Sequence, residues 1–191
     1  MTTTPARRLR VTYVSEAAAV EMPANPATAM LSITAPGSQA ELADGWGALL
    51  CIQFSDAEYD NATIQNFRSK GKRFDPTAKG FPDRRCAERM REFLDGLVDR
   101  PDIEELVVHC HAGQRRSAAV ARYAAERFGA DFDMTYDGYN RTVYALMRDP
   151  KCFSEQQLDP RVGSRTRGSA YLLGTGLLIC AAAVLAWCSN R

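Results

Sequence analysis

The chain lacks an excess of either charge. Its 191 residues carry 24 Lys and Arg against 23 Asp and Glu, which leaves a formal net charge of +1 at pH 7. Without a large basic excess, the sequence gives no indication of bulk nucleic-acid binding. The chain contains six cysteines but no Cys-X-X-Cys pair, and none of its Cys and His residues form a pattern that suggests zinc. The pattern therefore predicts no zinc site.

Long uncharged apolar stretches are also scarce. None follows Arg7 and Arg8, so no secretory signal peptide is expected. One does occur over 170–188, and its 19 residues are about as many as a helix needs to span a bilayer. Tyr171 and Trp187 lie near its two ends, where interfacial anchors are typical. This stretch predicts a single transmembrane helix.

The charges beside this stretch predict its orientation. Three arginines precede it, namely Arg161, Arg165 and Arg167, whereas the residues after it include a single arginine. The positive-inside rule then places the preceding domain in the cytoplasm, at the surface of a membrane that the chain crosses once. The expected organisation is a flexible N-terminus over 1–8, one domain over 9–150, a polar tether over 151–169 and the transmembrane helix over 170–188.

Strand and helix patterns alternate along the expected domain. Strands are predicted over 9–14, 30–34, 47–54 and 106–109, the third apolar enough for burial on both faces. Helices are predicted over 83–99, 117–128 and 135–148, with a short helix start at 15–17. Cys51 and Cys86 are expected on core faces. Asn140 and Arg141 are expected on a solvated helix face, with bracing of the 109–117 loop or contact with substrate as the alternative. The alternation predicts an α/β fold with a mainly parallel central sheet flanked by helices.

Residues 109–117, His-Cys-His-Ala-Gly-Gln-Arg-Arg-Ser, lie between a predicted strand and a predicted helix. Backbone N–H groups of such a loop, with the helix N-terminus, hold anions such as phosphate. The same positive field lowers the pKa of a thiol, which makes Cys110 a candidate nucleophile toward phosphorus. Gly113 allows close approach of the backbone, and the planar Arg116 side chain suits two phosphate oxygens. Ser117 is positioned to donate a hydrogen bond to the sulfur.

These nine residues resemble the signature His-Cys-X-X-Gly-X-X-Arg-Ser of cysteine-dependent protein tyrosine and dual-specificity phosphatases. The resemblance implies that the sheet and helices adopt a dual-specificity-phosphatase-like arrangement. It also implies a phosphocysteine intermediate on Cys110, with no cofactor and no metal, because loop amides and Arg116 neutralise the phosphoryl oxygens. The expected phosphate-binding residues are His111, Ala112, Gly113, Gln114, Arg115 and Arg116. The side chains of His111 and Arg115 are expected to point outward and shape substrate access.

This chemistry needs an acid that protonates the leaving oxygen. Asp56 directly follows an apolar strand, as the acid does in the phosphatases that the chain resembles. It precedes Cys110 by 54 positions, however, which is more than compact dual-specificity enzymes have. The extra length falls in the polar residues 57–82, which we interpret as an insertion. Asp75 and Asp83 remain alternatives, although Asp75 also fits a turn and Asp83 a helix N-cap.

The predicted function is hydrolysis of phosphotyrosine, with phosphoserine or phosphothreonine as further substrates, by an enzyme held at a membrane. The expected partners are a phosphorylated protein or peptide and the membrane itself. One alternative is a phosphoinositide phosphatase, because anchoring keeps the site near lipid headgroups. The other is a catalytically weak adaptor that binds phosphate, because the general acid is the least secure part of the pattern.

Overall fold

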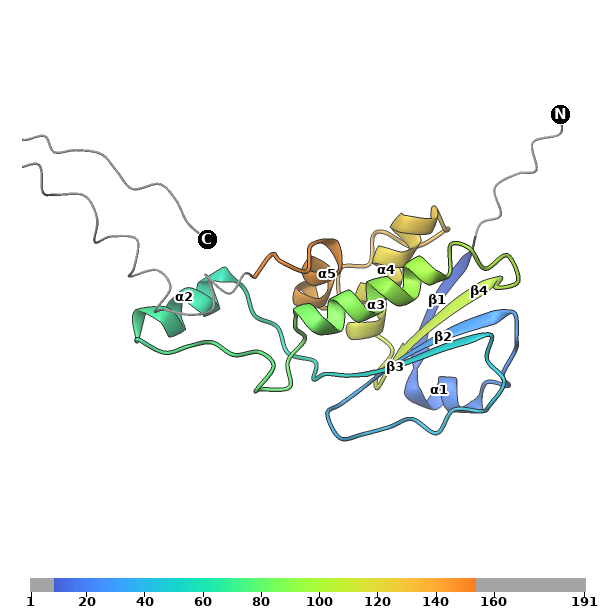
Figure 1. The fold of residues 1–191 in the computed structure, drawn as a ribbon, viewed down its shortest axis with the longest axis horizontal. Coiled ribbons are helices and arrows are strands. Elements are labelled where there is room, and N and C mark those ends of the chain that lie inside the picture. Colours follow the sequence, from blue (N-terminus) through green and yellow to red (C-terminus); the bar gives the residue numbers. More distant parts are fainter. Residues whose placement is uncertain (1–8, 154–191) are drawn as a thin grey trace, which may run out of the picture.

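The computed structural model describes residues 9–153. Within that range the sheet has four strands, β1 (Arg10–Ser15), β2 (Thr28–Thr34), β3 (Ala48–Gln53) and β4 (Glu105–Cys110). All three pairings are parallel, and the strands lie in the order β1-β4-β2-β3 (Figure 1). The predicted α/β fold with a mainly parallel sheet is therefore confirmed.

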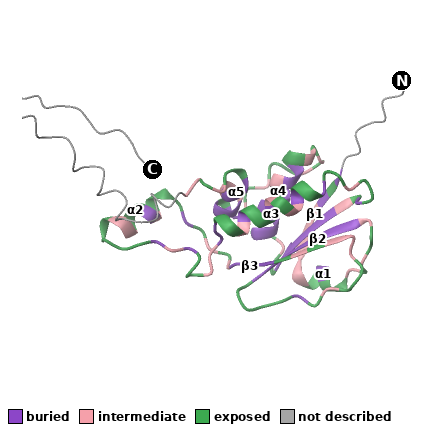
Figure 2. Cartoon of the chain, viewed as in Figure 1, coloured by how far each residue is buried: buried purple, intermediate pink, exposed green. Residues whose placement is uncertain are grey.

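One face of the sheet carries three helices, α3 (Arg84–Gly96), α4 (Arg116–Phe128) and α5 (Arg141–Arg148) (Figure 1). Alternate side chains of β2 and β4, such as Leu31 and Val108, join these helices in the main core. The other residues of the same strands, such as Met30 and Val107, face a smaller cluster with Ala19 of α1 (Glu16–Glu21). Both central strands are consequently buried on both faces, as Figure 2 shows.

Strand β3 differs from this pattern and corrects a prediction. It pairs only with β2, so it forms an edge of the sheet, and its side chains alternate between more and less exposed positions. Leu49 is 49% exposed and Cys51 is exposed, whereas Ile52 is buried. The expectation that this strand is buried on both faces, with Cys51 on a core face, was wrong. An apolar composition does not distinguish a central strand from an edge strand.

Helix α5 is shorter than predicted. It begins at Arg141 instead of residue 135, because Asn140 forms its N-cap with extended backbone and accepts a hydrogen bond from the Val143 N–H. The aromatic side chains Tyr136 and Tyr139 continue the helical spacing in the sequence but precede the helix in space.

A helix inside the polar segment 57–82 was not predicted. Helix α2 (Asn61–Ser69) begins after Asp60, whose carboxylate accepts a hydrogen bond from the Thr63 N–H. The segment builds a small core of its own, with Tyr59, Ile64 and Phe74 buried. Phe67, Phe81 and Phe153 pack against that core. Figure 1 shows α2 beyond the end of the sheet toward which β3 runs.

No helix among residues 9–153 is long and apolar enough to cross a membrane. The predicted transmembrane helix over 170–188 lies outside the described residues, as do residues 154–169 of the tether and the N-terminal residues 1–8.

Candidate active site

The loop that joins β4 to α4 directs its carbonyl groups outward. The Glu16 N–H donates to the carbonyl of His111, and the Tyr136 hydroxyl donates to that of Gln114. The carbonyl of Arg115 accepts from the Asn140 N–H at 3.0 Å. Because a backbone whose carbonyls are held on the outside turns amides to the inside, these contacts favour an anion-binding cup around Cys110.

Gly113 is essential to the shape of this loop. Its φ of 66° lies in the left-handed region, which side chains disfavour. A Cβ atom at this position would also overlap the backbone of Val14 and Ser15 at the end of β1. The loop can therefore pass this close to β1 only with glycine at position 113.

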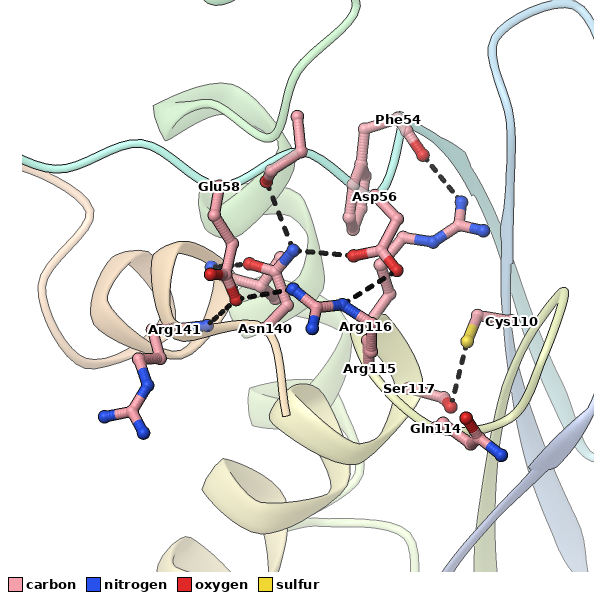
Figure 3. A network of polar contacts seen from close by, with 12 residues as sticks. Phe54, Asp56, Glu58, Cys110, Gln114, Arg115, Arg116, Ser117, Asn140 and Arg141 are labelled. Carbon is pink, nitrogen blue, oxygen red and sulfur yellow. Dashed lines mark hydrogen bonds and ion pairs between the residues drawn. The ribbon is translucent and has the colours of Figure 1, made fainter. Parts of the chain in front are cut away.

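Cys110 is buried at the end of β4, with its Sγ 3.2 Å from the Ser117 hydroxyl oxygen (Figure 3). Burial acts to raise the pKa of the thiol. Hydrogen bonds from the Ser117 hydroxyl and from the backbone N–H groups of Ser117, Gln114 and Gly113 outweigh it, so the pKa of Cys110 lies below its ordinary value. The loop thus stabilises a thiolate, which is the reactive form of cysteine.

His109 is fully buried, one residue before Cys110. Its pKa is lowered mainly by burial and also by the charge of Arg116, against an opposing effect of Glu16, so the ring is neutral near pH 7. Neither ring nitrogen has a hydrogen-bond partner among the described residues. The ring therefore does not supply a positive charge next to Cys110.

Arg116 opens α4 with only 5% of its surface exposed. Its Nη1 donates to the carbonyl of Phe54 at 2.7 Å, which links the loop to the end of β3. Its Nε is buried and has no partner within residues 9–153. A buried N–H without a partner costs about 1–3 kcal/mol, so a bound oxyanion that accepts from it is stabilised.

Asp56 lies beside the loop that carries Cys110, and two side chains from later in the chain hold its carboxylate (Figure 3). Its Oδ1 accepts a hydrogen bond from the Asn140 Nδ2 at 2.8 Å, and its Oδ2 lies 3.2 Å from the Arg115 Nε. The Arg115 Nη2 also pairs with Glu58 at 2.9 Å, and Glu58 accepts from the Arg141 N–H. Arg115 thus joins the loop between β4 and α4 to the segment that carries Asp56.

The structure engages Asp75 and Asp83 in local contacts. Asp75 accepts a hydrogen bond from the Ala78 N–H within a turn, as its sequence context indicates. Asp83 is the N-cap of α3, where it accepts from the Cys86 N–H, and it also accepts from the Thr77 hydroxyl. Of the three aspartates considered as general acid, Asp56 is the one bound to the loop through Arg115.

Asn140 contacts the Cys110 loop, which was the alternative to the solvated helix face that the sequence favoured. It is fully buried instead of lying on a solvated helix face. Its Nδ2 donates to Asp56 and to the carbonyl of Ala57, while its Oδ1 caps α5. An asparagine just before a helical apolar pattern is a recognised N-cap signal, so its cap role was detectable. Its contact with Asp56 joins residues 84 positions apart, which no local pattern indicates.

The remaining loop side chains point elsewhere. His111 is largely exposed, with its Nδ1 3.7 Å from a carboxylate oxygen of Glu16. Ala112, Gly113 and Gln114 line the turn itself. Within residues 9–153, no three His, Cys, Asp or Glu side chains converge in a group that could hold a metal ion.

No protein-family model, curated protein or solved structure matches this chain.

Proposed function

We propose that the protein is a cysteine-dependent phosphoprotein phosphatase with a dual-specificity-phosphatase-like domain. The observation that carries this proposal is the buried Cys110 thiol at the end of a parallel strand, with its pKa lowered by a loop whose amides surround it. A lowered pKa in a cup suited to oxyanions favours nucleophilic attack on phosphorus.

The reaction proceeds in two steps. In the first, the Cys110 thiolate attacks phosphorus, the bond from phosphorus to the substrate oxygen breaks, and Asp56 protonates that oxygen. In the second, the Asp56 carboxylate takes a proton from water, which attacks phosphorus and releases the thiolate. Ser117 stabilises the departing sulfur, and Arg116 with the loop amides binds the phosphoryl oxygens.

The substrate that we propose is phosphotyrosine in a protein or peptide, with phosphoserine or phosphothreonine as further substrates. We also propose that the uncharged stretch over 170–188 holds the enzyme at a membrane with its catalytic domain in the cytoplasm. Rates on a phosphotyrosine peptide and on a phosphoinositide, measured side by side, distinguish this proposal from the lipid-phosphatase alternative.

Turnover of an aryl phosphate by the full chain tests the mechanism. Cys110→Ser is expected to lower the rate on the order of a thousandfold or more, because a serine hydroxyl at this position is not ionised. Cys51→Ser is the matched control, since Cys51 is exposed on β3, and it is expected to leave the rate unchanged. Full activity of Cys110→Ser would refute the mechanism, and an inactive parent chain would favour the adaptor alternative.

A further inference from the structure

An unpartnered basic surface covers the segment around α2. Residues 61–81, called the basic insert from here on, carry five cations and one carboxylate. The cations are Arg68, Lys70, Lys72, Arg73 and Lys79. Three of the four lysines of the whole chain are among them. A balanced chain has thus concentrated positive charge in one short segment.

Most of these cations are exposed to solvent. All except Arg68 are exposed, and none forms an ion pair with a carboxylate in the part of the chain that the structure describes. The carboxylate of the insert, on Asp75, is engaged in its own turn with the Ala78 N–H. The positive charge of this surface is therefore not neutralised from within.

The basic insert is held as a defined body. Its buried Phe74 packs against Tyr59, with ring centroids 4.9 Å apart, and against Phe67 at 5.2 Å. The Nζ of Lys79 lies 5.7 Å from the centroid of the Phe67 ring, which fixes that cation over the aromatic cluster. The cations are consequently presented by a packed scaffold.

The position of the C-terminal end of the described chain indicates which partner the basic insert meets. Phe153, the last described residue, packs on Tyr59 in this same cluster at 4.9 Å between ring centroids. The 16 residues 154–169 then lead to the uncharged stretch over 170–188. Fully extended, they reach at most roughly 55 Å, so a bilayer that holds the stretch lies within reach of the basic insert.

We infer that the basic insert docks on the anionic headgroups of the bilayer that holds the chain. This inference rests on the membrane placement given under the proposed function, although not on catalysis. Exposed lysines and arginines next to a negatively charged leaflet are attracted to it within a Debye length. The insert follows the segment that carries Asp56 and Glu58 in the chain. Docking of the insert therefore orients that segment, and the domain with it, relative to the bilayer.

The test uses the full chain reconstituted in vesicles of neutral phosphatidylcholine, with or without about one third phosphatidylserine. A membrane-impermeant amine reagent labels Lys70, Lys72 and Lys79, and peptide mass spectrometry gives the rate at each. We expect these rates to fall about fivefold or more in the anionic vesicles and to recover in 0.5 M salt, as headgroup contacts are screened. In a parallel sample, a membrane-impermeant thiol reagent labels the exposed Cys51 on β3 outside the insert, and its rate is expected to be the same in both kinds of vesicle.

A charge-reversed pair gives the matched control. Lys72→Glu with Arg73→Glu is expected to abolish the protection of Lys70 and Lys79 in anionic vesicles. Arg85→Glu with Arg89→Glu changes the charge equally on exposed positions of α3 and is expected to retain it.

The outcomes separate this inference from the catalytic proposal. Equal lysine labelling in both kinds of vesicle, with the chain floating in each, overturns the inference alone. Protection by an added acidic phosphopeptide in neutral vesicles, without protection by anionic lipid, also overturns it and assigns the surface to protein substrates. A chain that floats with neither vesicle contradicts both the inference and the membrane placement. Cys110→Ser is expected to keep the protection, so a failure of catalysis leaves the inference intact.

Discussion

The loop that carries Cys110 and the segment that carries Asp56 lie side by side, but they are held in different ways. The first is held mainly through its own backbone: its carbonyls accept from the N–H groups of Glu16 and Asn140 and from the Tyr136 hydroxyl. Side chains position the Asp56 carboxylate, chiefly those of Arg115 and Asn140. The difference implies that the position of Cys110 is built into the fold, whereas the position of the Asp56 carboxylate depends on two side-chain contacts.

Gly113→Ala alters the loop that is held through its backbone, and we expect it to have the largest effect on stability and turnover among these variants. The positive φ costs about 1–3 kcal/mol and the overlap with β1 about as much again, so we expect a lower free energy of unfolding and a loss of turnover. Gly129→Ala is the control, because Gly129 has a similar φ of 61° and open space around it. Denaturant unfolding and aryl phosphate turnover measure both. Equal losses in the two variants would show that the approach to β1 is unimportant.

Asp56→Asn removes the proton donor and keeps its size. We expect the rate with a poor leaving group to fall on the order of 10²–10⁴-fold, and the rate with a good leaving group to change much less. Asp75→Asn serves as the control in the same steady-state assay. If Asp75→Asn gives the larger loss, the assignment of the acid to Asp56 is wrong.

Asn140→Asp separates positioning of the acid from folding. The aspartate oxygen still caps α5, but it cannot donate to Asp56 as the Asn140 amide does. Displacement of a reacting group by about 1 Å can cost on the order of a hundredfold, so we expect kcat to fall by up to that factor with little change in KM. Thermal unfolding checks that the fold is retained. An unchanged kcat would show that Arg115 alone holds the acid.

Ser117→Ala has the mildest expected effect, a shift in the pH profile of Cys110 alkylation. The pKa of Cys110 is below its ordinary value, so its thiolate persists at a pH where an ordinary thiol is protonated. Removing the Ser117 hydroxyl raises that pKa, and the fall in alkylation rate on acidification then occurs at higher pH. Mass spectrometry after iodoacetamide treatment follows the reaction. Cys86, whose pKa burial and Asp83 raise to about 12, is the unreactive reference. An unmoved profile would mean that the backbone amides alone stabilise the thiolate.

The contrast between the loop that carries Cys110 and the segment that carries Asp56 also explains which parts of the site the sequence could predict. The strand, Cys110, Gly113 and Arg116 are contiguous, and strand-to-helix periodicity with turn chemistry identifies such a loop. The partners of Asp56 come from positions 59 and 84 residues later in the chain, Arg115 and Asn140, so no spacing rule finds them. The edge position of β3 escaped prediction too, because strand order is set by tertiary pairing.

Helix α2 was missed for a different reason. Its mostly polar residues, with a single buried side chain at Ile64, give a weak helical pattern. The aromatic residues that stabilise it, Phe74, Phe81 and Phe153, lie outside the helix itself. Local periodicity therefore carried little of the information that folds this segment.

The position of β4 in the sheet has a consequence for synthesis of the protein. The ribosome makes β4 last of the four strands, yet β4 sits between β1 and β2, pairing Arg10 with Glu105. A nascent chain that has not reached residue 105 leaves the inner edges of β1 and β2 unpaired and open to association with other chains. The long stretch of chain between β1 and β4 must also close into a loop before these two strands can pair, which slows folding. The strand that completes the sheet is the one that ends in Cys110, so the surroundings that lower the pKa of the Cys110 thiol arise only when folding of the sheet is complete.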